Sequence, residues 1–222
     1  MSSPIRVLIA DDHKVVAQAL SDRLNREPDI EIVGTSHDGD AAVRDAERTQ
    51  PDVILMDVRM PGMNGVDAAR LIRDRRPDTK VVILTGAEEE QLIIDAIEAG
   101  ASGYLTKERA MDEVIGAVRA AHNGEILLPA AQLQRLLSNL RDRKRKVDDD
   151  KPMTRLTERE REVLREIATG SDNNIIADRL VISPHTLRTH IQNIMHKLDA
   201  HSKLEAVTIA LRQGLIELPR SV

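Results

Sequence analysis

The sequence predicts an α/β fold with a five-stranded doubly wound parallel sheet, followed by an all-α unit of four helices. Short β-branched apolar runs recur about every 25 residues through the first 125 residues, and stretches with helical periodicity separate them. The runs are continuously apolar rather than alternating, which is typical of parallel strands that are covered on both faces. The last 70 residues carry helix-start signals and no strand pattern, and they predict the helical unit.

Each predicted strand is followed by a predicted helix. The strands cover residues 5–10, 30–34, 53–57, 80–85 and 102–105. Apolar residues at helical spacing lie between them, for example Val15, Ala19, Leu20 and Leu24 in one stretch and Ile93, Ile94 and Ile97 in another. This alternation favours the strand order 2-1-3-4-5, in which ligands bind beyond the carboxyl ends of the strands.

The composition excludes several classes of function. The chain has 222 residues, with one tyrosine, Tyr104, and no phenylalanine, tryptophan or cysteine. Rows of aromatic rings that stack single-stranded nucleic acid are therefore excluded, and so are disulfides, thiolate zinc sites and iron-sulfur clusters. No apolar run approaches the length of a membrane span and no signal-peptide pattern is present. We therefore expect a cytoplasmic protein with an aliphatic core and no membrane partner.

The net charge of −5 conceals a division between the two halves of the chain. Residues 1–127 contain 15 Lys and Arg against 24 Asp and Glu, whereas residues 128–222 contain 17 against 13. An acidic unit joined to a basic one indicates that the second unit meets a polyanion.

Residues 128–152 are predicted to link an N-terminal unit, residues 1–127, to a C-terminal unit, residues 153–222. The linker begins with an amphipathic helix whose apolar positions are Leu133, Leu136, Leu137 and Leu140. A basic run at residues 141–146 follows, and acidic residues come directly after it. We favour a solvated helix end and a hinge, with contact between the basic run and DNA phosphates as the alternative.

Polar side chains gather where the predicted strands end. Asp11 and Asp12 end the first strand, Asp57 the third and Thr85 the fourth, and Lys107 follows the fifth. Three neighbouring carboxylates are unfavourable unless a cation accompanies them, and oxygen ligands without a cysteine or histidine cluster favour Mg²⁺. Lys107 can act as a mobile point charge for a phosphoryl group, and Asp57 can act as a nucleophile toward phosphorus.

The C-terminal unit has the spacing of a helix-turn-helix. Thr157 and Glu160 are spaced as a capping box, in which each side chain satisfies a backbone N–H at a helix start. Ser183, which a proline follows, is the predicted N-cap of a helix that continues to Leu198. The two other helices are predicted at about residues 173–180 and after Ser202. The tight connection between the second and third helices completes the pattern.

Four motifs surround the predicted strand ends of the N-terminal unit: Ile9-Ala-Asp-Asp-His13, Leu55-Met-Asp-Val-Arg-Met-Pro-Gly-Met-Asn-Gly65, Leu84-Thr-Gly86 and Gly103-Tyr-Leu-Thr-Lys107. With these motifs the unit resembles the receiver domain of bacterial response regulators over its whole length. The resemblance implies that a sensor histidine kinase phosphorylates Asp57. It also implies that Asp12, Asp57 and the carbonyl of Arg59 bind Mg²⁺, with Asp11 acting partly through water.

The same resemblance implies a conformational switch. Thr85 and Lys107 would bind the phosphoryl oxygens, and the small Gly86 would leave room for access. Movement of Thr85 would vacate a space that the ring of Tyr104 enters, so that a local charge biases a packing equilibrium. In the alternative interpretation, Tyr104 only packs against the rim of the sheet.

Residues 156–215 resemble the LuxR-type helix-turn-helix, which together with a receiver defines the NarL/FixJ class. The motifs are Leu156-Thr-Glu-Arg-Glu-Arg-Glu-Val-Leu164 and Ile182-Ser-Pro-His-Thr-Leu-Arg-Thr-His-Ile-Gln-Asn-Ile-Met-His-Lys-Leu198. Leucine and isoleucine at offsets of 4, 3 and 4 predict the buried stripe of the third helix, at Leu187, Ile191, Ile194 and Leu198. The predicted DNA contacts are Arg188, Thr189 and Gln192 to base edges, and Thr186, Lys197 and the helix N-terminus at Ser183 to phosphates.

The second helix of this motif departs from the family pattern. The usual Asn-Lys-Glu-Ile-Ala reads Asn173-Asn-Ile-Ile-Ala177 here, which places the apolar Ile175 on a partly exposed position. We expect Ile175 to pack against the first unit or a partner, or to alter DNA affinity.

The sequence therefore predicts a two-component transcriptional regulator in which phosphorylation controls dimerisation and promoter binding, and which is not an enzyme. A magnesium-dependent phosphohydrolase with Asp57 as nucleophile is one alternative. Such an enzyme needs a second carboxylate two residues after Asp57 as an acid or base, but this sequence has Arg59 at that position. The other alternative is a protein-interaction switch that does not bind DNA.

Overall fold

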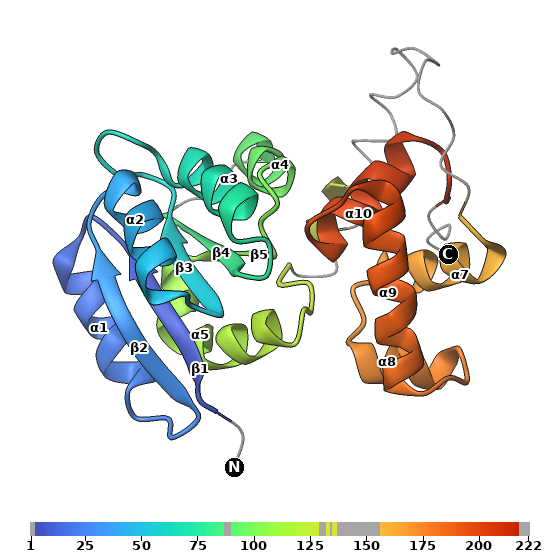
Figure 1. Cartoon of the computed structure of the whole chain (residues 1–222), viewed down its shortest axis with the longest axis horizontal. Coiled ribbons are helices and arrows are strands. Elements are labelled where there is room, and N and C mark those ends of the chain that lie inside the picture. Colours follow the sequence, from blue (N-terminus) through green and yellow to red (C-terminus); the bar gives the residue numbers. More distant parts are fainter. Residues whose placement is uncertain (1–2, 87–89, 129–131, 134, 137–155, 218–222) are drawn as a thin grey trace. The chain divides into compact units, whose positions relative to one another are not determined.

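The computed structural model describes residues 3–86, 90–128, 132–133, 135–136 and 156–217 (Figure 1). The chain separates into two compact units, Met1–Leu127 and Leu128–Val222. Most of the predicted linker, including Leu137, Leu140 and the basic run at 141–146, lies outside the described residues. None of the described helices is long and apolar enough to cross a membrane.

The first unit is built on a five-stranded parallel sheet with the order β2-β1-β3-β4-β5, which confirms the predicted order. The strands are β1 (Ile5–Ala10), β2 (Ile30–Ser36), β3 (Val53–Asp57), β4 (Lys80–Thr85) and β5 (Gly103–Thr106). Strand β2 runs two residues beyond the predicted end because an irregularity in its register with β1 brings Ser36 opposite Ala10. The central strand β3 is buried along its whole length, as expected for a strand covered on both faces.

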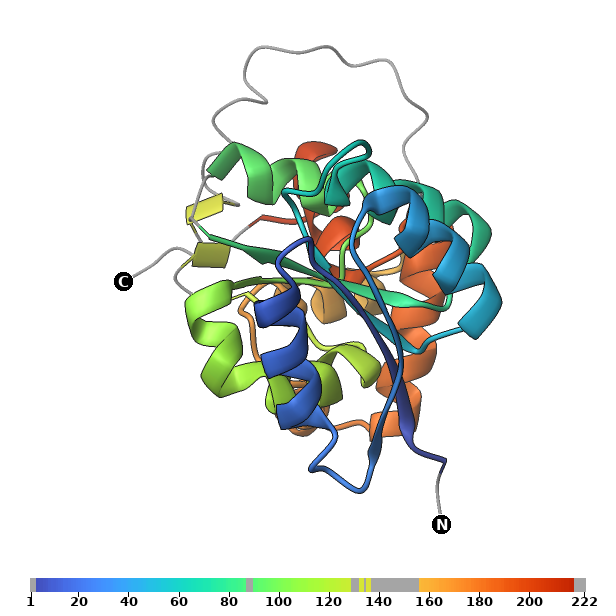
Figure 2. The same ribbon diagram turned by 90° about the vertical axis from the view of Figure 1, so that its left-hand side faces the viewer.

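Helices cover both faces of the sheet (Figures 1 and 2). They are α1 (Lys14–Leu24), α2 (Gly39–Thr49), α3 (Gly65–Arg75), α4 (Glu90–Glu98) and α5 (Lys107–His122). Helices α1 and α5 share one aliphatic core with the sheet, while α2, α3 and α4 lie on the opposite face. The connections place the carboxyl ends of all five strands at one edge, and this edge carries the polar residues.

One of the apolar residues at helical spacing does not join the core. Val15 is 83% exposed, whereas Ala17, Leu20 and Leu24 are buried. Helix α1 begins at Lys14, so Val15 lies in its first turn and faces solvent, and the buried stripe starts two residues later.

Gly65 fixes the start of α3 against the end of β3. A Cβ at this position would lie 1.9 Å from the carbonyl oxygen of Asp57, so any other side chain would displace the backbone. The N–H of Gly65 also donates to the carbonyl of Val58 at 2.9 Å. The loop after Asp57 is therefore held close to the sheet edge.

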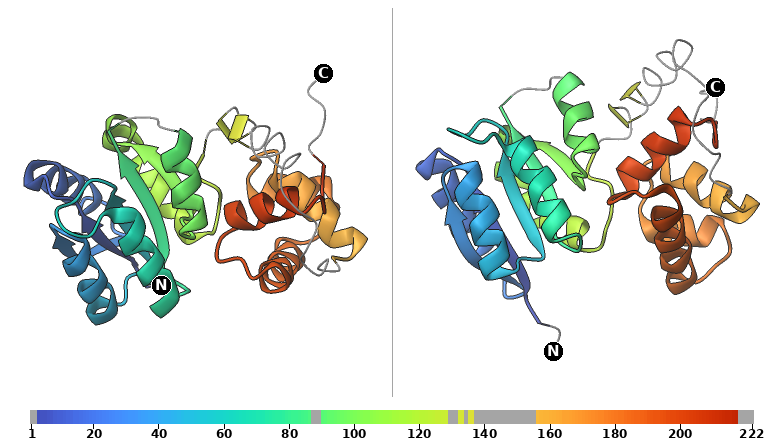
Figure 3. Two further views of the ribbon diagram at one scale, coloured as in Figure 1. Left: turned by 90° about the horizontal axis from the view of Figure 1, so that it is seen from above. Right: turned by 45° about the horizontal axis from the view of Figure 1, so that its top comes forward.

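The second unit consists of helices that pack on one another (Figure 3). Its described helices are α7 (Glu158–Ile167), α8 (Asn173–Arg179), α9 (Pro184–Leu198) and α10 (Lys203–Arg212). Thr157 and Glu160 form the predicted capping box, and the hydroxyls of Ser183 and Ser202 accept N–H groups at the starts of α9 and α10. The predicted stripe of α9 is buried, at Leu187, Ile191, Ile194 and Leu198.

Candidate functional site

The edge of the sheet brings together the acidic and basic residues that the sequence singled out. The Nζ atom of Lys107 lies 2.7 Å from Oδ2 of Asp57 and 2.8 Å from Oδ2 of Asp11. Asp57 and Asp11 come from the adjacent strands β3 and β1, and Lys107 opens α5 directly after β5. Asp12 directly follows Asp11. One carboxylate oxygen from each of Asp11, Asp12 and Asp57 lies within 4.8 Å of the other two.

The site carries more negative charge than its own residues neutralise. Asp11 and Asp57 are 0% and 2% exposed, and the Asp12 side chain is 31% exposed. Three carboxylates face one ammonium group, which leaves a charge of about −2. The Oδ2 atom of Asp11 is buried and receives no directed hydrogen bond, although the Lys107 ammonium lies beside it. This oxygen-rich, under-neutralised site fits a divalent cation.

Burial and the neighbouring charges shift the pKa values of Asp57 and Lys107 in this site. Burial raises the pKa of Asp57 above its usual range, the neighbouring Lys107 acts against this increase, and the charge of Asp11 adds to it. Burial alone would lower the pKa of Lys107, but its contacts with Asp11 and Asp57 outweigh burial and raise it. Lys107 therefore stays charged, and Asp57 ionises more readily when a cation or donor approaches.

Thr85 and Tyr104 lie on the same face of two adjacent strands. Tyr104 is in register with Ile83, and Thr85 is two residues beyond Ile83 on β4, so its side chain points to the same face. Both side chains are buried, Thr85 at 4% and Tyr104 at 3% exposed. A Cβ at Gly86 would meet no atom of the described residues within 4 Å, so the space beside this position is open. The need for a small residue there stays a prediction.

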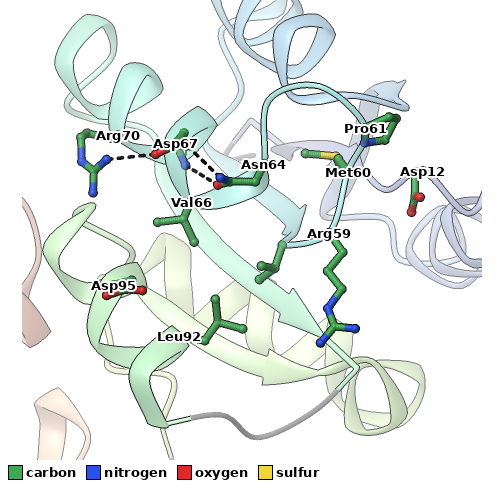
Figure 4. A pocket seen from close by; sticks show the side chains of 11 residues that line it. Asp12, Arg59, Met60, Pro61, Asn64, Val66, Asp67, Arg70, Leu92 and Asp95 are labelled. Carbon is green, nitrogen blue, oxygen red and sulfur yellow. Dashed lines mark hydrogen bonds and ion pairs between the residues drawn. The ribbon is translucent and has the colours of Figure 1, made fainter.

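A pocket adjoins the acidic site between α3 and α4 (Figure 4). Its volume is roughly 770 Å³. The lining residues are Asp12, Val58, Arg59, Met60, Pro61, Asn64, Val66, Asp67, Arg70, Leu92 and Asp95. The N–H of Arg59 donates to Oδ1 of Asp57 at 3.3 Å, which anchors the loop at the mouth of the pocket. The role of the Arg59 carbonyl as a metal ligand stays a prediction.

The second unit presents the predicted base-reading face to solvent. Arg188, Thr189 and Gln192 are exposed on α9, on the side opposite its buried stripe. Ser183 and Thr186 are also exposed, and the Ser183 hydroxyl caps the helix through the N–H of Thr186 at 3.0 Å. The start of α9 is therefore a formed and solvent-facing helix N-terminus.

The structure places Lys197 in an ion pair, and its predicted contact with a DNA phosphate stays a prediction. The Nζ atom of Lys197 lies 2.7 and 2.8 Å from the two carboxylate oxygens of Glu160. Glu160 is buried, with 3% of its surface exposed. Glu160 also accepts the N–H of Thr157 at 2.7 Å in the capping box. Lys197 is thus held by a structural ion pair between α7 and α9. The sequence did not reveal this pair because its members are 37 residues apart.

Arg188 differs from the other cations of the described C-terminal residues. Acidic side chains neutralise Arg159, Arg161, Arg165, Arg179 and Lys197. Lys203 and Arg212 also have interaction partners. Among the Lys and Arg side chains of residues 156–217, Arg188 alone makes no ion pair or hydrogen bond.

Two apolar residues of the second unit are exposed. Ile175 on α8 is 44% exposed, as the sequence predicted, and Val181 after α8 is 89% exposed. Val181 also has a φ of 54°, an unfavourable conformation for a β-branched residue. The chain therefore holds a strained, solvent-facing valine in the turn before α9.

Comparison with known families finds a match for each of the two units. Residues 7–119 match the model of the response regulator receiver domain. Residues 154–210 match the model of bacterial regulatory proteins of the luxR family. The chain is a response regulator with a LuxR-type DNA-binding domain. Its strand order and helical C-terminal unit are those expected for this family.

Relatives of this response regulator match along nearly all of its length. It is 40% identical to the transcriptional regulatory protein LiaR of Bacillus subtilis, over 96% of this chain and 99% of that protein. It is 37% identical to the transcriptional regulatory protein YxjL of the same organism, over 96% of this chain and 98% of YxjL. Its structure resembles that of the response regulator RcsB of Salmonella typhimurium, with a TM-score of 0.55 and 25% sequence identity. The match covers 93% of this chain and 97% of the RcsB chain.

Proposed function

We propose that a sensor histidine kinase phosphorylates this response regulator on Asp57, and that phosphorylation controls dimerisation and binding to promoter DNA. The observation that carries the proposal is the buried Asp57 carboxylate, 2.7 Å from the Lys107 ammonium in a site with excess negative charge. The family is one of transcription regulators with a DNA-binding domain. This supports a regulator that acts on DNA in the cytoplasm rather than a phosphohydrolase.

The proposed reaction is transfer of a phosphoryl group. An oxygen of Asp57 forms a bond to phosphorus while the bond between phosphorus and the donor imidazole nitrogen breaks. Lys107 is placed to neutralise charge on the phosphoryl oxygens, because its ammonium already contacts Asp57. Thr85, at the end of the neighbouring strand, is the proposed hydroxyl donor to the same oxygens.

The residues proposed to hold Mg²⁺ are the carboxylates of Asp12 and Asp57 and the carbonyl of Arg59, with Asp11 acting partly through water. The excess negative charge and the buried Asp11 oxygen support this assignment. When bound, the ion neutralises charge that develops on the transferring oxygens. The chain itself orients those carboxylates by placing them on adjacent strand ends.

The proposed switch couples Thr85 to Tyr104. Their position on one face of β4 and β5 supports the coupling, since a displaced Thr85 side chain leaves room beside the buried ring. A phosphoryl group adds roughly −1.5 to −2 charges and three acceptor oxygens, which is sufficient to draw a hydroxyl toward it.

The proposed DNA contacts lie on the exposed face of α9. Arg188 can pair bidentately with guanine and Gln192 with adenine, and Thr189 lies on the same exposed face. The unpartnered Arg188 supports this proposal because its guanidinium is available without breaking an ion pair. Dimers would then read two half-sites about one helical turn apart or at related spacings.

The test measures operator binding by the wild-type protein and by Asp57→Ala, each with and without a small-molecule phosphodonor. We expect the donor to increase wild-type affinity and to leave Asp57→Ala unchanged. Emission from Tyr104 provides a second readout, because the chain has no other aromatic residue. Equal, donor-independent binding by both proteins would contradict the phosphorylation switch, and steady turnover of phosphoesters would instead support the phosphohydrolase.

A further inference from the structure

We propose that His13 is an additional ligand at the acidic site, and that the site binds transition-metal ions such as Co²⁺ and Zn²⁺ through an imidazole as well as carboxylates. The inference rests on the proposed metal site and adds a nitrogen ligand to it. The strand-end carboxylates that the sequence offers there supply oxygen ligands alone. The structure places the ring of His13 among them, with its potential ligand atom within 4.8 Å of one oxygen each of Asp11, Asp12 and Asp57.

The spacing of these atoms is close to that of ligands around a single ion. The Nδ1 atom of His13 lies 3.5 Å from Oδ1 of Asp11 and is hydrogen-bonded to Oδ1 of Asp12 at 2.5 Å. With bonds of roughly 2.1 Å, adjacent ligand atoms are about 3 Å apart and opposite ones about 4.2 Å. An ion that replaces this hydrogen bond must therefore move the ring slightly away from Asp12 and draw the outermost ligand atoms, which lie within 4.8 Å of one another, slightly inward.

The backbone explains why the ring lies there. His13 is the N-cap residue of α1, but its side chain makes no capping hydrogen bond. Its own N–H donates instead to Oδ1 of Asp11 at 2.8 Å, which holds the residue close to the end of β1. An N-cap side chain usually satisfies an N–H of the first turn. Here the imidazole is 66% exposed and hydrogen-bonds to Oδ1 of Asp12 instead of capping the helix, and this contact keeps Nδ1 beside the carboxylates.

His13 and Lys107 approach different carboxylate oxygens. Lys107 contacts the Oδ2 atoms of Asp11 and Asp57, whereas His13 is near the Oδ1 atoms of Asp11 and Asp12. An ion on the His13 side can therefore bind without displacing the lysine. Mg²⁺ prefers oxygen ligands, while imidazole suits zinc and other late transition metals. The consequence is selectivity: His13 strengthens binding of Co²⁺ and Zn²⁺ and leaves Mg²⁺ nearly unaffected.

The experiment titrates the unphosphorylated full chain with Co²⁺, followed by visible absorption, and with Mg²⁺, followed by calorimetry. The variants are His13→Ala and a matched control, His37→Ala. The control ring contacts the same region, with Nδ1 at 2.9 Å from the backbone carbonyl of Asp11, but it does not belong to the ligand cluster. We expect His13→Ala to weaken Co²⁺ binding on the order of tenfold or more and Mg²⁺ binding less than twofold, and His37→Ala to change neither.

A second measurement does not depend on the variants' affinities. Zn²⁺ added to ¹⁵N-histidine-labelled wild type should shift one Nδ1 resonance, which is missing from the spectrum of His13→Ala. Co²⁺ affinity that is equal in wild type and His13→Ala, with no shift of that resonance, would overturn the His13 assignment while the Mg²⁺ site stands. Failure of wild type to bind either ion would overturn the proposed metal site and this inference together.

Discussion

At the scale of single residues, two side chains are kept in unfavourable states. Burial and the charge of Asp11 raise the pKa of Asp57, so its ionised form is disfavoured until a counter-charge arrives. Val181 is strained in its backbone and exposes its side chain almost completely. The proposed role of Asp57 as phosphoacceptor explains its state, whereas the packing of the described residues of the second unit gives no such reason for Val181.

Replacing Val181 tests its strain directly. A left-handed conformation costs a residue with a Cβ roughly 1–2 kcal/mol, and glycine is free of this cost. We expect Val181→Gly to raise the free energy of unfolding of the second unit by about 1 kcal/mol, since little burial is lost. Val181→Ala, which keeps a Cβ, is the matched control and should gain less. Chemical denaturation measures both, and a destabilised Val181→Gly would show that the valine packs usefully.

At the scale of elements, Glu160 joins α7 to α9. Burial alone would raise the pKa of Glu160, but the hydrogen bonds from Lys197 and from the Thr157 backbone hold it below its usual range. A carboxyl with a lowered folded-state pKa stabilises the fold above its unfolded pKa, and this stabilisation is lost as pH falls through the folded value. The orientation of α9 therefore depends on an ion pair outside the face proposed to contact DNA.

Glu160→Gln tests that link. We expect the variant to lose about 1–3 kcal/mol of stability at pH 7, because Lys197 loses its charged partner and the capping box is weakened. The difference from wild type should shrink as the pH falls below about 4.3, where the unfolded carboxyl protonates. Thermal unfolding between pH 7 and pH 3 measures this. A difference that stays constant over this range would contradict the ionic contribution of Glu160.

At the scale of the whole molecule, the basic excess of the second half of the sequence lies outside residues 156–217, which contain 8 Lys and Arg against 9 Asp and Glu. The N-terminal 127 residues are acidic, and most Lys and Arg side chains described in the C-terminal unit are already paired. The proposed duplex binding therefore has few free cations within residues 156–217, and the proposed base contacts on α9 would supply most of its specificity. This arrangement predicts weak nonspecific affinity.

The salt dependence of duplex binding checks this expectation. Each neutralised phosphate contributes about 0.9 to the slope of log affinity against log salt, so we expect a slope of roughly −1 to −2 per subunit. Replacing Arg143, Lys144 and Arg145 by glutamine should leave the slope unchanged if residues 141–146 act only as a hinge. A slope that flattens markedly in this variant would assign phosphate contacts to the basic run.

Much of the first unit could be predicted because its signals are local. Continuous apolar runs mark β1, β3 and β4 at their observed bounds, and strand ends place Asp57 and Lys107 at one edge. Val15 was misplaced because apolar spacing does not fix the residue at which a helix begins. His13 was overlooked as a ligand because sequence adjacency to Asp12 does not reveal the direction of its ring.

The sequence by itself determined the two units, the strand order, the capped helices and the family of this protein, because periodicity, caps and motifs act over short stretches of chain. Only the tertiary structure decided which charges are satisfied. Glu160 pairs with Lys197, Arg188 has no partner among residues 156–217, and the buried Asp11 oxygen is left under-neutralised. These outcomes depend on distances between residues far apart in the chain, and burial makes the under-neutralised Asp11 oxygen energetically costly.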